Sequence, residues 1–200
     1  MNIEEIKYKN PETDLEMVTL YLQIQGILPE LLQRRDLMKS LKVLHDEPEV
    51  WRIWWQLGEV RIMFHKIMPA LADKAFFHPH PWPSMVRILK GHYINTIGIY
   101  NGPKEDVEKL LPEELDEYGT TLVPMEIHIG ESSMYRMLDV RQFHKVVSGN
   151  PVYSLMITGL PYFPGATKQF SRQPVVQNPP LTAEEQDDII AVVKQHYNIL

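Results

Sequence analysis

One stretch dominates the sequence: Phe76-Phe77-His78-Pro79-His80-Pro81-Trp82-Pro83-Ser84, in which two histidines alternate with prolines. Proline fixes φ at about −65°, so prolines at alternate positions favour an extended chain. Side chains of an extended chain repeat every second residue, and we therefore expect His78 and His80 to project from one face. Their Cα atoms would lie roughly 6 to 7 Å apart, and both imidazoles could then reach one metal ion at about 2.1 Å.

The His-x-His pair also has a plainer interpretation, in which both residues are loop histidines of a proline-rich turn. Two protein ligands rarely hold a divalent ion, so a metal site needs a third residue from elsewhere. A solitary histidine, His144, lies downstream just before another β-like run. Three imidazoles would leave open positions on the ion, and open positions permit chemistry.

The spacing after the two histidines resembles the first motif of the cupin superfamily, which reads His-x-His, three or four residues, Glu, six residues, Gly. Here Ser84 stands in place of the glutamate and Gly91 follows six residues later. The second cupin motif centres on one further histidine, which His144 matches without the usual preceding Gly and Pro-x-Gly. The resemblance therefore implies His144 as the third metal ligand beside His78 and His80. Because the carboxylate is missing, the chain resembles the three-histidine branch, which includes thiol dioxygenases and related non-haem iron oxygenases.

This resemblance implies a mainly β fold: a cupin-like double-stranded β-helix, or jelly roll, with N-terminal helices and a C-terminal helix. It implies a divalent transition metal, Fe(II) first and Zn, Ni or Mn as alternatives, and a dioxygenase-like reaction on a small organic substrate. It also implies a homodimer. Cysteine is not the expected substrate, because the strand that carries Ser-His-Tyr in cysteine dioxygenases has Ser154, Met156 and Thr158 here.

The alternative function is a non-catalytic cupin that binds a small molecule or serves a structural role. Under that hypothesis, Ser84 weakens the metal site because a hydroxyl does not replace a carboxylate ligand. Whether the protein is an enzyme stays open at this point, and no catalytic residue is assigned.

The composition limits the classes of function. With 200 residues, of which 44% are hydrophobic, the chain can bury one good-sized core. A net charge of −6 without a basic stripe argues against a nucleic-acid partner. The chain has no cysteine, which excludes disulfides, thiolate ligands and a cysteine nucleophile. No secretory signal and no apolar stretch of about 18 residues is present, so we expect a cytoplasmic protein that does not enter a membrane.

Three helices are expected before the barrel, over residues 13–26, 29–44 and 46–58. Thr13 with Glu16 is a capping-box pattern for the first, and Pro29 is placed to open the second. In the third, Trp51, Trp54 and Trp55 would form one stripe at helical spacing. That stripe predicts packing of the helix against a sheet, with a stacking platform for a ligand as the alternative.

From residue 59 the pattern changes to short runs rich in β-branched and aromatic residues, which predict a sandwich or barrel. The expected strands are 60–68, 76–82, 84–90, 92–100, 121–129, 133–138, 142–148 and 152–158. The acidic insertion 104–117 predicts a helical turn or two, 166–180 an extended arm, and Thr182 with Glu185 the cap of a last helix. One structural domain results, with a helical segment 1–58, a barrel 59–160 and an arm with a helix 161–200.

Because side chains alternate between the two faces of a strand, the sequence also predicts which neighbouring residues share a face with the histidines. Ser84, Val86 and Ile88 should face the side of the histidines, while Arg87 should face away with Met85 and Leu89. Ser84 could then bind a ligand by a hydrogen bond.

Further candidates for binding or supporting roles lie on neighbouring strands. Arg61 and Arg136 are candidates to hold an anionic group, although each could equally be a surface arginine. Tyr135 and Ser154 are candidate donors in the pocket. His128 is a reserve candidate for a fourth ligand or for a residue that supports the ligands.

Overall fold

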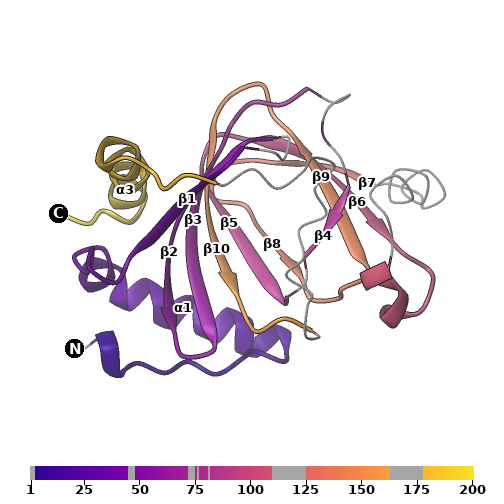
Figure 1. The fold of residues 1–200 in the computed structure, drawn as a ribbon, viewed down its shortest axis with the longest axis horizontal. Helices are drawn as coiled ribbons and strands as arrows, with labels where there is room; N and C mark the ends of the chain where they lie inside the picture. Colours follow the sequence, from indigo (N-terminus) through magenta and orange to yellow (C-terminus); the bar gives the residue numbers. More distant parts are fainter. Residues whose placement is uncertain are drawn as a thin grey trace.

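Two antiparallel sheets form the framework of the computed structural model, which describes residues 3–44, 48–71, 75, 77–80, 82–109, 125–162 and 178–200 (Figure 1). The six-stranded sheet has the order β1-β2-β3-β10-β5-β8, and the four-stranded sheet has the order β4-β9-β6-β7. The strands are β1 (Lys39–Val43), β2 (Val50–Leu57), β3 (Val60–Ile67), β4 (His78–Pro79), β5 (Ser84–Lys90), β6 (Tyr93–Ile99), β7 (Met125–Ile129), β8 (Met134–Met137), β9 (Gln142–Val147) and β10 (Val152–Thr158). The described part of the chain is therefore mainly β, with two antiparallel sheets, as the resemblance implied.

Side chains from both sheets meet in a shared interior. Its apolar part combines the six-stranded sheet with residues of β6, β7 and β9 in one buried cluster: Met63, Val86, Ile88, Tyr93, Ile129, Val146, Val152 and Met156. Val86 and Ile88 thus point inward, as the alternation predicted, and Arg87 faces away, with its guanidinium 5.8 Å from the ring of Tyr21.

Helices α1 (Asp14–Leu31) and α3 (Ala183–Tyr197) pack on the outer face of the six-stranded sheet (Figure 1). A second buried cluster joins apolar residues of α1 and α3 to those of β2, β3 and β10, including Ile53, Phe64 and Leu155. Both predicted capping boxes are present, because Thr13 and Thr182 each accept a hydrogen bond from the backbone of the glutamate three residues later. These two helices close one side of the barrel and leave the interior to the sheets.

The expected second helix, 29–44, is wrong. Helix α1 runs through Pro29 to Leu31, because Ile27, Leu28 and Leu31 are buried against the sheet and this burial outweighs the loss of the proline N–H. The later part of that range forms β1, which pairs with β2. In addition, the backbone N–H of Lys42 in β1 donates a hydrogen bond to the carbonyl oxygen of Pro179 (2.8 Å). Pairing with a neighbouring strand decides the structure of a segment this short.

The expected third helix, 46–58, is also wrong, since Val50–Leu57 is the strand β2. The tryptophans have helical spacing only by coincidence. In the strand, side chains alternate between the two faces, so Trp51 and Trp55 face the helices and Trp54 faces the interior. Strand β2 joins β3 through a tight turn at Gly58, whose φ of 68° favours glycine. The sheet therefore begins at Lys39 rather than near residue 59.

Most of the other predicted strands are confirmed to within two residues. The expected strand 76–82 is only the two-residue β4, and residues 121–124 of another lie outside the described part. The acidic insertion begins with a 3-10 helix (Lys104–Lys109) whose Val107 packs with Phe143 of β9, and the rest of the insertion lies outside the described residues. Most of the expected arm also lies outside them. Among the described residues, no helix is long and apolar enough to cross a membrane.

Candidate metal centre

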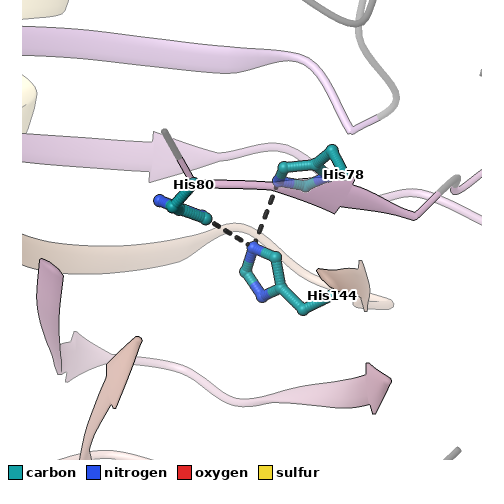
Figure 2. A group of neighbouring side chains, drawn as sticks. All are labelled: His78, His80 and His144. Atoms are coloured by element: carbon teal, nitrogen blue, oxygen red, sulfur yellow. Dashed lines mark hydrogen bonds between the residues drawn. The ribbon is translucent and has the colours of Figure 1, made fainter. Parts of the chain in front are cut away.

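Three histidines that are far apart in the sequence turn their rings toward one point (Figure 2). His144 Nε2 lies 2.9 Å from His80 Nε2 and 3.1 Å from His78 Nε2. Two ligand atoms at right angles, each about 2.1 Å from one ion, are about 3.0 Å apart. The two distances from His144 Nε2 therefore suit adjacent positions around a single metal ion. The ligand atoms of the three histidines all lie within 4.8 Å of one another.

The pairing of β4 with β9 produces this convergence. His78 is the register partner of His144 in the four-stranded sheet, so the two side chains stand opposite each other on the same face. His80 follows two residues later, and the tilted rings of His78 and His80 have centroids 5.6 Å apart. The extended conformation inferred from the prolines is thus present where the site needs it, although the strand itself is short.

Asn95 of β6 fixes the orientation of His144. Its side chain is fully buried, and its Oδ1 lies 2.9 Å from His144 Nδ1. Because Oδ1 only accepts, His144 must donate from Nδ1, and the neutral ring then presents the lone pair of Nε2 to the other two histidines. A histidine held through its second nitrogen in this way is the usual arrangement at protein metal sites.

The environment keeps two of the three histidines uncharged. Burial, with a further contribution from His78, lowers the pKa of His80 and of His144 well below the usual imidazole range. Both rings are therefore neutral at pH 7, which is the form that binds a metal ion. Among the buried residues that the structure describes there is no Asp or Glu, so an ion bound here would keep most of its charge.

Two tyrosines adjoin the histidines, of which Tyr93 is buried and Tyr135 is half-buried. Tyr93 donates a hydrogen bond of 2.6 Å to the hydroxyl oxygen of Tyr135, and the ring centroid of Tyr135 lies 6.4 Å from that of His144. Burial raises the pKa of both hydroxyl groups, which stay protonated at neutral pH. Since the oxygen of Tyr135 accepts from Tyr93, its own proton is directed to another acceptor, and Tyr135 is placed as a donor next to the site.

Three other predicted residues point into the interior. Ser84 and Ser154 are 0% and 1% exposed, and neither hydroxyl has a hydrogen-bond partner in the described chain. Arg61 also faces inward, with its guanidinium 5.5 Å from the ring centroid of Trp82. The three-histidine group includes none of these residues.

The structure does not bring His128 and Arg136 to the site. His128 is exposed on β7 and has the opposite orientation to Ile127 and Ile129, which pack in the interior. Arg136 forms an ion pair of 3.0 Å with Asp14 of α1 on the outer side of the sheet. Both residues occupy outward positions of their strands. The alternation in the sequence alone did not show which face of these two strands is the inner one.

Sequence reasoning missed Asn95, Arg52 and His65. Arg52 lay in a segment predicted to be helical, which hid its inward direction, and Arg52 Nε donates a 2.9 Å hydrogen bond to His65 Nε2. His65 and Asn95 each carried a signal, because each is a polar residue at an inward position of an otherwise apolar strand. Burial of a polar side chain requires a partner, and the partner can be a functional group.

The sequence matches no protein-family model and no curated protein. Among solved structures, the chain is similar to Fe(II) HppE, with a TM-score of 0.44 and 11% identity over 62% of this chain and 56% of that one. It is similar to hydroxypropylphosphonic acid epoxidase from S. wedmorenis (TM-score 0.41, 14% identity, 62% and 56% covered). It is also similar to an RmlC-like cupin from Shewanella frigidimarina (TM-score 0.42, 6% identity, 64% and 88% covered).

The matched region spans just over half of the length of the first two proteins. At these scores and identities, nothing that they bind or catalyse transfers to this chain. The chain's own two antiparallel sheets and its three convergent histidines define it as a mainly β protein with a candidate three-histidine metal centre.

Proposed function

We propose that this protein binds a divalent transition metal ion through His78, His80 and His144 and acts on a small organic substrate as a dioxygenase-like enzyme. Fe(II) is the ion proposed first, because of the resemblance to the three-histidine oxygenases. The observation that carries the proposal is the convergence of three Nε2 atoms, with Asn95 holding His144 in the tautomer that a metal ligand requires.

The surrounding residues suit a reaction site. Met63, Val86 and Ile88 form an apolar wall that keeps bulk water from the interior. Tyr135, protonated and adjacent to His144, can donate a hydrogen bond to a polar atom of the bound substrate and orient it. Bound Fe(II) would supply the redox chemistry for inserting oxygen into a small chelating substrate.

The metal content of the purified protein tests the proposal. We expect near-stoichiometric iron, or another transition metal, by elemental analysis, and its loss in the His78→Ala/His144→Ala double variant. A screen of small chelating compounds with O₂ uptake as the readout would then test turnover. Wild type and double variant that are equally free of metal after anaerobic reconstitution would overturn the proposal.

Ser84 favours the second candidate function, a non-catalytic binding protein. The buried hydroxyl replaces the glutamate of most cupins, and a serine hydroxyl is a weak metal ligand. A site of three neutral ligands could serve to bind a small molecule without turnover. This function predicts metal binding with no O₂ consumption for any chelating substrate.

We also propose a homodimer, because jelly rolls have edge strands that need to be covered. The edge strand β1 already has a neighbour, because the backbone N–H of Lys42 donates a hydrogen bond to the carbonyl oxygen of Pro179. Strand β8 at the other end of that sheet and β7 at one end of the four-stranded sheet are the candidate edges for a dimer interface. Sedimentation at micromolar concentration should give twice the monomer mass. Placing a proline in β7 or β8 should dissociate the dimer if that edge forms the interface, and a monomeric wild type would refute the proposal.

A further inference from the structure

A polar row crosses the inner face of the six-stranded sheet. In the pairing register, Arg52 of β2 is opposite His65 of β3, and His65 is opposite Ser154 of β10. Adjacent strands are about 4.8 Å apart, so the three residues form one continuous line. The next inward row is apolar, with Met63 opposite Met156, and the contrast marks the polar row as a separate feature.

Hydrogen bonding within the row fixes its chemistry. Arg52 Nε donates to His65 Nε2, so the neutral ring of His65 carries its proton on Nδ1. Ser154, 1% exposed, has a hydroxyl with no partner in the described chain. A buried hydroxyl without a partner is costly, and a ligand that accepts its proton would remove that cost.

The row faces the same interior as the three-histidine group. His144 lies on β9 two residues before Val146, which belongs to the interior cluster, and Met63 and Met156 in the row next to the polar one belong to the same cluster. His65 is 6% exposed, and both His80 and Arg52 contribute, after burial, to lowering its pKa. The charge of Arg52 also lowers the pKa of His80. These directions agree with the strand positions, which place Arg52 and His65 on the inner face.

We propose that Arg52, His65 and Ser154 form a subsite for the oxyanionic group of the substrate, a carboxylate or a phosphonate, whose other polar atom binds at the three-histidine centre. The proposal rests on the proposed function for the role of the metal ion. A guanidinium matches an oxyanion with paired N–H donors, the hydroxyl of Ser154 adds another donor, and the neutral imidazoles leave an ion's positive charge to be balanced by the ligand. The substrate is thus a small organic anion with a second polar atom next to the charged group.

Three small probes separate the anionic group from the chelating one. Glycolate and hydroxymethylphosphonate carry the two kinds of oxyanion, and glycolamide is the uncharged counterpart. Binding is measured by calorimetry and by the visible spectrum of Co(II)-loaded protein. The quantity that matters is the preference for anion over amide in each variant, because the ion itself also attracts anions.

We expect Arg52→Gln to reduce that preference by about 10-fold or more, the usual effect of losing a hydrogen bond to a charged group. Arg52→Lys should retain part of it, since the charge remains without the planar fork. Ser154→Ala should cause a smaller loss. Whichever of the two anions shows the larger dependence on Arg52 identifies the class of substrate.

His65 is expected to act as a positioning residue for Arg52. His65→Gln keeps an acceptor for Arg52 Nε, whereas His65→Phe removes it. We expect the first variant to retain most of the anion preference and the second to lose it, with Co(II) stoichiometry unchanged in both. Equal behaviour of the two variants would remove His65 from the subsite.

Arg61→Gln is the matched control, because Arg61 also faces inward on β3 but lies about 13 Å from His65 along the strand. Loss of anion preference in Arg61→Gln, with Arg52→Gln unaffected, would overturn the proposal in favour of Arg61. Unchanged preference in both variants would overturn it outright.

Co(II) stoichiometry and thermal stability, measured for each variant, identify a variant that has failed to fold. If the wild type bound no Co(II), the proposed function would fail independently. The same titrations of metal-free protein would then decide the subsite: an Arg52-dependent preference for the anions upholds it, and no preference refutes it.

Discussion

Asn95 is the residue on which the affinity for metal should depend most strongly after the ligands themselves. Its Oδ1 holds the Nδ1 proton of His144 at 2.9 Å and so directs the Nε2 lone pair toward the centre. We predict that Asn95→Ala lowers metal affinity about 10- to 100-fold, the usual effect of removing such a partner. Competition titration with Zn(II) or Co(II) measures this change.

Ser84→Ala is the control for Asn95. Ser84 is likewise fully buried at an inward position, but its hydroxyl has no partner in the described chain. Removal of that hydroxyl should leave metal affinity within about 2-fold and stability nearly unchanged. Equal metal affinities of Asn95→Ala and wild type would show that His144 does not need this hydrogen bond.

At the level of single residues, the sequence predicted which side chains face inward once the strand was known. The positions of His78, His80, Ser84 and Ser154 follow from alternation. The inward direction of Arg52 did not, because it lay in a segment with the wrong predicted structure. The partner of His144 could not be predicted either, since the contact depends on the register between β6 and β9, which no local pattern encodes.

At the level of elements, the attachment of α3 to the outer face of the sheet depends partly on Asp188. Its Oδ2 accepts hydrogen bonds from Lys66 Nζ (2.8 Å) and from the Tyr153 hydroxyl (2.9 Å). Burial opposes the ionisation of Asp188, but these two bonds outweigh it and lower the pKa of the carboxyl group. The side chain is 40% exposed, so solvent limits the contribution.

We predict that Asp188→Asn destabilises the protein by about 1 kcal/mol at neutral pH, a decrease in Tm of about 2 to 4 °C. Because the folded-state pKa is the lower one, the stabilisation is complete above the unfolded-state pKa of about 3.9 and is lost as the pH falls through the folded-state value. Thermal melts from pH 7 to pH 3 should therefore show the two proteins converging in acid.

Asp187→Asn is the neighbouring control, since Asp187 pairs with Arg35 where the side chains are 67% and 40% exposed. Exposed pairs contribute little, so its Tm should stay within about 1 °C of wild type at every pH. A difference between Asp188→Asn and wild type that persisted unchanged at pH 3 would show that the effect does not come from the charge.

The elements that the sequence predicted correctly are those whose local signals agree with their surroundings. The capping boxes at Thr13 and Thr182 mark helix starts by local hydrogen bonds, and the strand Val152–Thr158 is apolar enough to be buried on both faces. The segment 39–57 failed because its leucines and tryptophans also fit a helical spacing. Only pairing with β3 distinguishes the two structures, and pairing is a property of the whole sheet.

At the scale of the whole molecule, metal binding should be visible as stability, because only the folded chain brings the three histidines together. A ligand present at 100 times its dissociation constant stabilises the folded state by about 2.7 kcal/mol. For a chain of this length we therefore expect Co(II) or Zn(II) to raise Tm by about 5 to 10 °C. The double variant His78→Ala/His144→Ala should show no such increase.

The dependence of this stabilisation on pH tests the same assembly. In the unfolded chain the histidines take up protons below about pH 6.5, whereas burial keeps His80 and His144 neutral in the folded protein, with their pKa lowered. Folded-state stability without metal should fall as the pH drops below that value, because the unfolded state then binds more protons. The increase caused by metal depends on the folded state, in which His80 and His144 are still neutral, so it should persist at pH 5.5 and be lost only when the pH falls through their lowered folded-state values. Calorimetric melts at pH 7.5 and 5.5, with and without metal, give both quantities. An increase of equal size in the double variant would place the metal away from the three histidines.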